Sequence, residues 1–573
     1  MAKRSSRSEP VYTRTPIEAE RGVCAGGHPT VADAGIRLMQ EGGNAFDALV
    51  GAAFTAFVVE PAMCGLGGYA RISAYAPGRG GFLSFDAYAR APLAATPNMF
   101  DPDAARAPTY YGHPVTTGDR AERGFHAVAV PGAVAGCCDA HEMLGRLPLA
   151  QVMAPAIEAA QAGIEIAWSE LLALAEVSRH FDEFPDTRET WMPGGALPST
   201  PFPRVRRVRI DASALAATLR RIAARGKRGF YAGRTAKALD AYMRANGGIL
   251  SGADLDAYNT RILREWPQRY RNHDYVTCLD QVGYESLNLL GHFDLRRLGS
   301  DSHRYRHLVA EALAVAFTDS MTHYGDPDFE NAPVNGLAHA GFAARRRRAM
   351  RVASALPRPV EAGNPWPWER FVDAPERIET RPGAARVSGT SQVAVADREG
   401  NMASICMSIG GTFGSLVHVP ELGIVLNNAM QNFDPRPDHP NAIKPGKMPI
   451  FAAPVLVAAR DGEGRFAGAG SGGYRIETAV LHAFMNVIDH RMRIQRAVDH
   501  PRVHCQGGET YVDARIPPVV RRRLARAGHE VVVVAEDPGS LHFGRVAAVT
   551  REPRSGVLRA GAGPVWRTAA AGY

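Results

Sequence analysis

Thr390 is the first residue whose type and position could do chemistry. It opens a stretch, Thr390–Asp397, in which residue character alternates with period two, as expected of a β-strand. Inside a chain, a threonine here is an ordinary strand residue. Freed as a chain N-terminus it becomes a nucleophile, because its own α-amine lies within reach of its hydroxyl and has a reference pKa of about 7.7–8. Gly389, just before it, leaves space at a self-cleavage point.

A glycine-rich turn is the second candidate. It reads Gly468-Ala-Gly-Ser-Gly-Gly473 between a predicted strand and a predicted helix, and it has the form GxGxxG. A dinucleotide site also needs a parallel strand and an acidic residue after that helix, whereas here a further helical stretch follows at 494–498. The backbone N–H groups of Gly472 and Gly473 could instead form an oxyanion hole at the helix start. A plain tight turn is the alternative interpretation.

Motifs for a metal or a cofactor are absent from the sequence. The chain contains no GxSxG, HExxH or Walker A pattern. Its seven cysteines are scattered and include no CxxC pair, which indicates reduced thiols rather than a zinc site or a disulfide framework. His28, His418 and His482 lack ligand spacing and are interpreted as structural. We therefore expect neither a metal nor a cofactor.

The composition is that of an ordinary globular protein, with 46% hydrophobic and 22% charged residues in 573. The 66 basic and 58 acidic residues give a net charge of +8, which is small for this length. The densest basic run, Arg345–Arg348, has no interleaved aromatic residues, so we expect a solvated helix face and no nucleic-acid partner. The first 20 residues hold no apolar signal-peptide core, and the longest apolar run, Ala48–Val59, is too short to span a bilayer. The expected location is the cytoplasm, without a membrane partner.

The elements that must position these candidates can be read from periodicity. Thr30 is expected to cap a helix that ends at Gly42-Gly43, and a second helix covers residues 44–59. A proline-rich stretch, 355–389, has the character of a long extended or mobile loop. A β-hairpin, 390–397 and 402–408, follows it directly. Strands are also expected at 70–75, 423–426, 454–458 and 531–534, and helices at 131–144, 149–161, 215–224, 307–319 and 474–492.

Spaced motifs cover nearly the whole chain in a fixed order. They are His28-Pro29, Ala34-Gly35, Gly42-Gly-Asn-Ala-Phe-Asp47, Val59-Glu-Pro61, Gly65-Leu-Gly-Gly68, Thr390-Ser-Gln392, Asp397-Arg-Glu-Gly-Asn401, Phe413-Gly-Ser415, Gly423-Ile-Val-Leu-Asn-Asn428, Gly472-Gly473 with Arg475, and Ala571-Gly-Tyr573. In this order they resemble the γ-glutamyltransferase family of N-terminal nucleophile hydrolases. The resemblance is specific because several spaced motifs agree rather than one.

The resemblance implies an α+β fold, an αββα four-layer sandwich made from both fragments of a self-cleaved chain. Cleavage between Gly389 and Thr390 would leave a large subunit, 1–389, and a small catalytic subunit, 390–573, with 355–389 as a mobile segment before cleavage. The family's roles fall on Thr390 as nucleophile, on the Gly472 and Gly473 N–H groups as oxyanion hole, and on Ser408 as the hydroxyl that orients the Thr390 amine. The resemblance also implies a heterodimer of the two fragments, with a dimer of these heterodimers left open.

The pocket positions depart from the family. True γ-glutamyltransferases hold the α-carboxylate of the donor with an arginine, where this chain has Tyr88, and Arg90 lies two residues further on. The positions that hold the α-ammonium read Gly410, Ala429 and Asn432. A pair of serines that also binds the carboxylate is replaced around Phe451 and Ala452, in a stretch that is one residue shorter. Losing one partner of a buried charge pair costs about 2–5 kcal/mol, so these losses predict a poor γ-glutamyl site.

Three functions remain open on the sequence. The leading one is an amidohydrolase or acyltransferase acting on a small acyl amide that is not γ-glutamyl, since the family includes a cytoplasmic oxamate amidohydrolase and cephalosporin-type acylases. The alternative is a glutathione hydrolase or γ-glutamyltransferase that uses Arg90 in an altered donor pocket. The last is an uncleaved, non-enzymatic relative, in which Gly389-Thr390, Ser408 and the glycine pair would persist without use.

Overall fold

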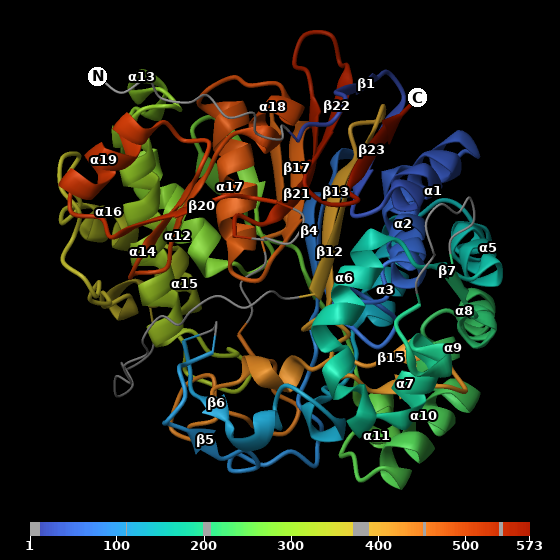
Figure 1. Cartoon of the computed structure of the whole chain (residues 1–573). Coiled ribbons are helices and arrows are strands. Elements are labelled where there is room, and N and C mark those ends of the chain that lie inside the picture. The colour runs from blue at the N-terminus through green and yellow to red at the C-terminus, as the bar shows by residue number, and fades with distance from the viewer. Residues whose placement is uncertain (1–11, 110–111, 199–207, 371–388, 451–453, 538–541) are drawn as a thin grey trace, which may run out of the picture.

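The computed structural model describes residues 12–109, 112–198, 208–370, 389–450, 454–537 and 542–573. Two seven-stranded antiparallel sheets pack face to face between helices (Figure 1). The first sheet has the order β23 (Ala569–Gly572), β2 (Gly22–Gly26), β12 (Gly389–Asp397), β13 (Met402–Gly410), β3 (Tyr69–Ala76), β4 (Gly81–Ala87) and β9 (Arg261–Leu263). The second has the order β1 (Ile17–Ala19), β22 (Leu558–Ala562), β21 (Arg545–Arg551), β17 (Glu463–Ser471), β16 (Leu456–Arg460), β11 (His273–Val276) and β10 (Gln268–Tyr270).

Helices form the two outer layers. Against the first sheet lie α1 (Pro29–Gln40), α2 (Ala45–Val59) and α3 (Ala133–Leu144). Against the second lie α17 (Arg475–Ile488) and α18 (Ile494–Asp499), with α12 (Gln281–Gly291) and α14 (His303–His323) packed beside them. Other helices include α5 (Ala154–Ala162), α8 (Ser213–Arg225), α10 (Gly233–Ala245), α16 (Ala340–Arg347) and α19 (Pro518–Arg526). This arrangement confirms the expected αββα sandwich.

The alternation in β12 explains which way its side chains point. Ala394 and Ala396 belong to the apolar layer between the two sheets, whereas Val393 and Val395 belong to the core shared with α2. Successive side chains of a strand face opposite sides, so Thr390 and Gln392 share the inter-sheet side with Ala394. The period-two pattern of the sequence therefore places the candidate nucleophile inside the sandwich and not against the helices.

Several element boundaries differ from those expected. The helix at 29–40 begins one residue earlier than the predicted Thr30 cap, because the Nδ1 atom of His28 accepts the Thr30 backbone N–H (3.1 Å) and so caps the helix itself. The helix expected at 149–161 is divided into α4 (Leu149–Val152) and α5. The helix expected at 474–492 ends at Ile488. The hairpin expected at 390–408 is present as β12 and β13.

The segment expected to be a mobile loop is anchored along its first part. The Ala355 backbone N–H donates to the Ala527 carbonyl (2.6 Å), and that of Leu356 to Glu311 Oε2 on α14 (2.7 Å). Further on, the Gly363 N–H donates to Asp319 Oδ1, also on α14 (2.5 Å). Residues 371–388 lie outside the described part of the chain. Hydrogen bonds to α14 therefore hold Leu356 and Gly363, and a bond to Ala527 holds Ala355.

Candidate active site

Thr390 and Ser408 lie directly opposite each other on β12 and β13, and both are buried. Their hydroxyl oxygens are 3.2 Å apart. Both hydroxyls also donate to the carbonyl oxygen of Gly389, from 2.7 Å for Thr390 Oγ1 and 2.5 Å for Ser408 Oγ. Ser408 Oγ accepts the Gly410 N–H (2.8 Å), which fixes the direction of its own proton toward Gly389. The two hydroxyls thus converge on the peptide bond that would be cut.

The strand pairing is irregular at this peptide bond. Gly389 pairs with Gly410 and Thr390 with Ser408, so the register shifts between Gly389 and Thr390 and Ile409 is the extra residue. Gly389 admits no side chain here, because a Cβ would lie 2.7 Å from the carbonyl oxygens of Ala62 and Gly411. In the uncut chain, only a glycine fits at the position before Thr390.

The glycine turn lies at the same end of the sandwich as Thr390. Ser404 Oγ donates to the carbonyl of Leu456, which pairs with Gly468, and Cys406 Sγ donates to the carbonyl of Gly470 (both 3.5 Å). Each step of two residues along β13 therefore matches a step of two along β17. One further step of two residues along both strands places Ser408 beside Gly472, at the end of β17. Thr390 pairs with Ser408 across the β12–β13 ladder and therefore lies at the same end.

Gly472 and Gly473 join β17 to the start of α17 with left-handed backbone angles, φ +126° and +57°. A Cβ at Gly472 would lie 3.0 Å from the Gly544 Cα atom, so the position combines an unfavourable φ with close backbone contact. The Gly472 and Gly473 carbonyls accept the N–H groups of Arg475 and Ile476 and open the helix. This geometry is that of a helix start, where backbone N–H groups favour negative charge. No dinucleotide fold surrounds it, because β17 pairs antiparallel with both β16 and β21.

Two tyrosines and an asparagine line the other side of Ser408. Tyr69 pairs with Ser408 across the β3–β13 ladder, and its ring lies 4.3 Å, centroid to centroid, from that of Tyr88. Burial raises the pKa of the Tyr69 hydroxyl, and hydrogen bonding with Ser408, Tyr88 and Asn432 opposes the rise. The Asn432 amide donates to the Tyr88 hydroxyl. The Arg71 guanidinium, paired with Asp86, lies 5.5 Å from the Tyr88 ring centroid. A hydroxyl-lined, aromatic group of side chains therefore stands beside the candidate nucleophile.

The remaining predicted pocket residues have different surroundings. Arg90 donates to the Gly446 carbonyl (3.2 Å) and lies over the Tyr258 ring, so its guanidinium has other partners than the Tyr88 side chain. Gly410, with φ +94°, packs against Asn428, whose Oδ1 accepts the Gly411 N–H. Ala429 is fully buried at the start of the short helix that ends with Asn432. Phe451 and Ala452 lie outside the described residues.

A buried carboxyl group stands on the opposite face of β12. Ser391 Oγ donates to Glu60 Oε2 (2.7 Å), and the Arg545 guanidinium adds a favourable charge interaction. Burial raises the pKa of Glu60 to about 7, against the lowering effects of Ser391 and Arg545. Glu60 therefore changes charge near neutral pH while bonded to Ser391, the residue that follows Thr390.

Sequence reasoning missed two residues beside the site. Tyr69 directly follows the Gly65-Leu-Gly-Gly68 motif and Glu60 lies within the Val59-Glu-Pro61 motif, so both were inside recognised stretches. Their partners, Ser408 and Ser391, are more than 300 residues away in the chain. Strand pairing brings Tyr69 to Ser408, whereas packing of α2, which ends at Glu60, against β12 brings Glu60 to Ser391. Position inside a motif was the signal that could have marked them.

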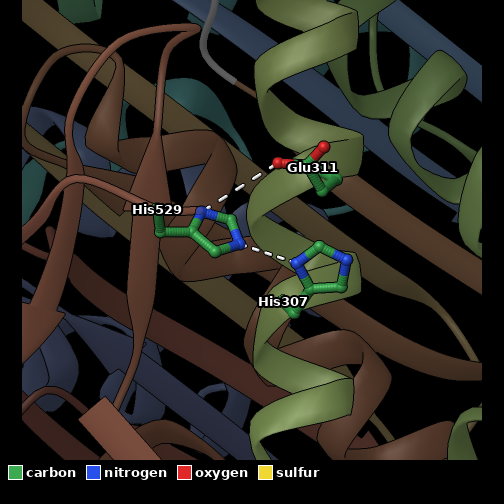
Figure 2. A group of neighbouring side chains, drawn as sticks. All are labelled: His307, Glu311 and His529. Carbon is green, nitrogen blue, oxygen red and sulfur yellow. Dashed lines mark hydrogen bonds and ion pairs between the residues drawn. The ribbon is translucent and has the colours of Figure 1, made fainter. Parts of the chain in front are cut away.

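One group of described residues could be considered for a metal: His307, Glu311 and His529, all buried. Figure 2 shows the His529 ring between the other two, with one ring nitrogen toward each. His307 Nε2 contacts the Arg351 carbonyl (2.7 Å), which can only accept, so His307 Nδ1 accepts from His529 Nε2 (2.7 Å). His529 Nδ1 is then left to accept from Thr510 Oγ1 (3.0 Å), and Glu311 pairs with Arg358. These contacts use the imidazole lone pairs, so the group is a hydrogen-bonded chain that ties α14 to the strands around β19 (Thr510–Asp513).

Among the described residues, none of the helices combines the length and the apolar character needed to cross a bilayer.

Known proteins resemble this chain over nearly its whole length. A family model described as Gamma-glutamyltranspeptidase matches residues 31–573. The Acylase ACY 1 proenzyme of Pseudomonas sp. (strain SE83) is 33% identical over 527 residues, 91% of this chain and 88% of that protein. The Glutathione hydrolase proenzyme of Pseudomonas sp. (strain A14) is 32% identical over 513 residues, 86% of this chain and 83% of that protein.

A solved structure shares the whole fold. The crystal structure of cephalosporin acylase from Bacillus halodurans superposes with a TM-score of 0.84 at 27% identity and covers 100% of this chain and 99% of that one. Since the family model spans most of the chain and relatives above 30% identity cover more than four fifths of it, the chain belongs to the gamma-glutamyltranspeptidase family of N-terminal nucleophile hydrolases.

Proposed function

We propose that this enzyme is an N-terminal threonine acylase that cuts its own chain before Thr390 and then hydrolyses a small acyl amide other than a γ-glutamyl amide. The observation that carries the proposal is the convergence of the Thr390 and Ser408 hydroxyls on the Gly389 carbonyl. Two of the relatives, an acylase and a glutathione hydrolase, are proenzymes by name, which supports a self-cleaved chain of two fragments acting on small substrates.

The contacts at Gly389 support self-cleavage. Thr390 Oγ attacks the Gly389 carbonyl carbon, and Ser408 donates to the carbonyl oxygen as negative charge develops there. The Thr390 hydroxyl proton passes to the Thr390 nitrogen and the Gly389–Thr390 C–N bond breaks, which leaves Gly389 as an ester on Thr390 Oγ and frees the Thr390 α-amine. Water hydrolyses the ester and releases the Gly389 carboxylate. The register shift at this bond supports the reaction, because it removes Gly389 from a regular ladder.

Turnover reuses the same groups on an external amide. The free Thr390 amine takes the hydroxyl proton, and Thr390 Oγ attacks the substrate carbonyl. The Gly472 and Gly473 N–H groups hold the oxyanion, and Ser408 positions the amine. The leaving amine or ammonia takes the proton, and water resolves the acyl-enzyme. No metal or cofactor takes part in these steps.

The donor pocket supports an acyl group without a γ-glutamyl head. The family resemblance puts Tyr88 at the position of the carboxylate-binding arginine of the transferases, and the Tyr88 ring packs on Tyr69 and beside Arg71. Arg90 is engaged with Gly446 and Tyr258 instead. Two relatives are acylases by name, which supports an acyl group other than γ-glutamyl, and the Tyr69 hydroxyl and Asn432 amide offer hydrogen-bonding groups for a small oxamate-like amide.

Glutathione hydrolysis is the second candidate, because the glutathione hydrolase of Pseudomonas sp. (strain A14) is nearly as similar as the acylase. It requires the Arg90 guanidinium to leave the Gly446 carbonyl and turn toward the donor. A turnover panel separates the two. γ-Glutamyl anilide and glutathione are compared with oxamate, simple aliphatic amides and a cephalosporin side-chain amide. A kcat/KM for γ-glutamyl anilide above those of all other amides would overturn the acylase proposal.

The nucleophile itself is tested by intact mass under denaturing conditions. We expect two fragments of about 42 and 20 kDa from the 61.6 kDa chain, and a single chain for Thr390→Ala. The matched control is Ser404→Ala, because Ser404 lies on the same face of β13 but makes only a 3.5 Å contact with the Leu456 carbonyl. A wild-type chain that stays intact, or a Thr390→Ala chain that is still cut at this bond, would contradict the assignment.

The location and assembly extend the proposal. We infer a cytoplasmic enzyme, because all seven cysteines are buried free thiols, as is usual in a reducing compartment. Its basic unit is the heterodimer of the two fragments. Cell fractionation with a disulfide-forming reporter as comparison tests the location, and light scattering of the purified enzyme tests for a dimer of heterodimers.

A further inference from the structure

A cavity of about 500 Å³ opens at the end of the second sheet. Arg460 and Arg465 enter it from β16 and β17, and Arg491 and Arg493 from the chain that follows α17. Arg551 and Arg559 lie at the facing ends of β21 and β22, with Arg554 between these strands. Its volume is within the range of small-molecule sites.

The cavity carries an excess of positive charge. Its seven arginines are matched by four carboxylates: Glu463 pairs with Arg465, Asp461 with Arg460, Glu552 with Arg559, and Glu18 with both Arg559 and Arg493. Three positive charges are therefore left over. Among the described residues, no carboxylate forms an ion pair with Arg491, Arg551 or Arg554.

Two of the seven arginines of the cavity have buried N–H donors without a hydrogen-bond partner among the described residues. Arg465 is only 9% exposed, yet its Nε and Nη1 atoms lack a hydrogen-bond partner among the described residues. Arg551 Nη1 donates to the Arg398 carbonyl (3.1 Å), but its Nε is buried and unpaired in the same sense. An unpaired buried donor on a charged group is costly, and an anion in the cavity would satisfy it.

His273 lies in the wall of the cavity and is affected by the same positive charges. Burial, together with the positive charges of the neighbouring Arg460 and Arg465, lowers its pKa to about 4. The imidazole therefore stays neutral at physiological pH and leaves the cationic surface to the arginines.

The cavity is separate from the active site. Arg465 is the third residue of β17, whereas the glycine turn follows its last residue, Ser471. Six strand steps at about 3.4 Å each place the two about 20 Å apart. A ligand in this cavity therefore cannot touch Thr390.

We propose that this cavity binds a small oligophosphate anion, with adjacent phosphates seated between Arg465 and Arg551 and its outer charges facing Arg491 and Arg554. The planar guanidinium fork matches the geometry of phosphate oxygens, and two or three linked phosphates carry the charge that the arginines leave unbalanced. The phosphates belong either to a free oligophosphate or to a nucleotide.

Calorimetric titration of the purified enzyme with tripolyphosphate, at about 0.15 M salt, tests the proposal. We expect one site per chain. Arg465→Gln should weaken binding by about tenfold or more, as loss of a charge-assisted contact implies. Because that side chain is buried, the exposed pair Arg491→Gln with Arg554→Gln serves as a second variant, with the same loss expected. The matched control is Arg522→Gln with Arg526→Gln, the same change in charge on the exposed face of α19.

Each outcome has a meaning. Binding at least as tight for ATP as for tripolyphosphate, with the same variant effects, assigns the phosphates to a nucleotide, and weaker binding of ATP assigns them to a free oligophosphate. The proposal fails if the wild type shows no saturable binding at millimolar tripolyphosphate. It also fails if the control pair loses affinity equally, or if citrate binds as tightly as tripolyphosphate.

Discussion

At the scale of single residues, the site depends on two hydroxyls that share one carbonyl. Ser408 is held by the Gly410 N–H and points its proton at Gly389, so the Gly389 oxygen has a donor before any reaction begins. A preorganised donor at the developing oxyanion is the largest single term in most acyl transfers.

Ser408→Ala removes that donor while leaving Thr390 in place. We expect self-cleavage to slow by about 10²–10³-fold, the usual effect of losing one oxyanion donor. Ser408→Thr keeps a hydroxyl and should retain most of the rate. A time course of fragment formation on denaturing gels measures both, and equal rates for Ser408→Ala and wild type would show that Ser408 takes no part.

At the scale of elements, the β12–β13 hairpin holds the two candidate catalytic hydroxyls. Its two strands carry Thr390 and Ser408 to the same end, and the register of the ladder shifts at the peptide bond before Thr390. The glycine at 389 is part of this device, because the carbonyls of Ala62 and Gly411 approach it too closely for a side chain.

Gly389→Ala therefore displaces the scissile bond. We expect cleavage to slow by about tenfold or more, because an increase of about 1.4 kcal/mol in the activation free energy already has that effect. Gly508→Ala is the control, because a Cβ there meets nothing within 4 Å. The half-time of fragment formation in freshly purified protein gives the comparison. An unchanged half-time for Gly389→Ala would rule out the steric role of this glycine.

The hydrogen-bonded chain around His529 predicts how stability depends on pH. Burial lowers the pKa of His529 to about 3, below the ordinary value of about 6.5 in an unfolded chain. Between these two pKa values, His529 binds a proton in the unfolded state but not in the folded state. The free energy of unfolding therefore falls as pH decreases from about 7 toward 3.

The measurement is the melting temperature between pH 7.5 and 5 by calorimetry. His529→Gln should flatten the decrease at low pH, because an amide can keep the contacts to Thr510 and His307 without binding a proton. The exposed His292→Gln should leave the slope unchanged. Identical slopes for His529→Gln and wild type would contradict the assignment of the proton to His529.

At the scale of the whole molecule, the proposed cleavage before Thr390 would not divide the fold. In the first sheet β2 lies between β23 and β12, and β13 pairs with β3, so strands from both sides of Gly389 are interleaved. In the second sheet β22 pairs with β1 and β16 with β11. The two fragments share both sheets and the apolar layer between them.

We therefore expect the fragments to elute together from a sizing column and to separate only in denaturant. Unfolding should be a single cooperative transition, because neither fragment holds a complete sheet. Light scattering after cleavage gives the mass of the complex, and Thr390→Ala provides the uncut reference. Separation of the fragments in native buffer would overturn this interleaved assembly.

The sequence by itself determined a large part of this protein. Period-two alternation and the glycine spacing located the hairpin, the candidate nucleophile and the turn after β17, because these signals are local and the chain repeats them over a few residues. Ordered motifs were enough to indicate the family and its sandwich. The boundaries at Thr30 and Ile488 were less predictable, since capping by His28 depends on one side-chain contact.

Only the tertiary structure decided which distant residues meet. Tyr69 beside Ser408, Glu60 beside Ser391 and the arginines around Arg465 come from segments far apart in the chain. Such contacts follow from strand order and sheet packing, which no local pattern encodes. The same is true of Arg90, which lies two residues from Tyr88 yet turns to Gly446 because the strand has ended before it.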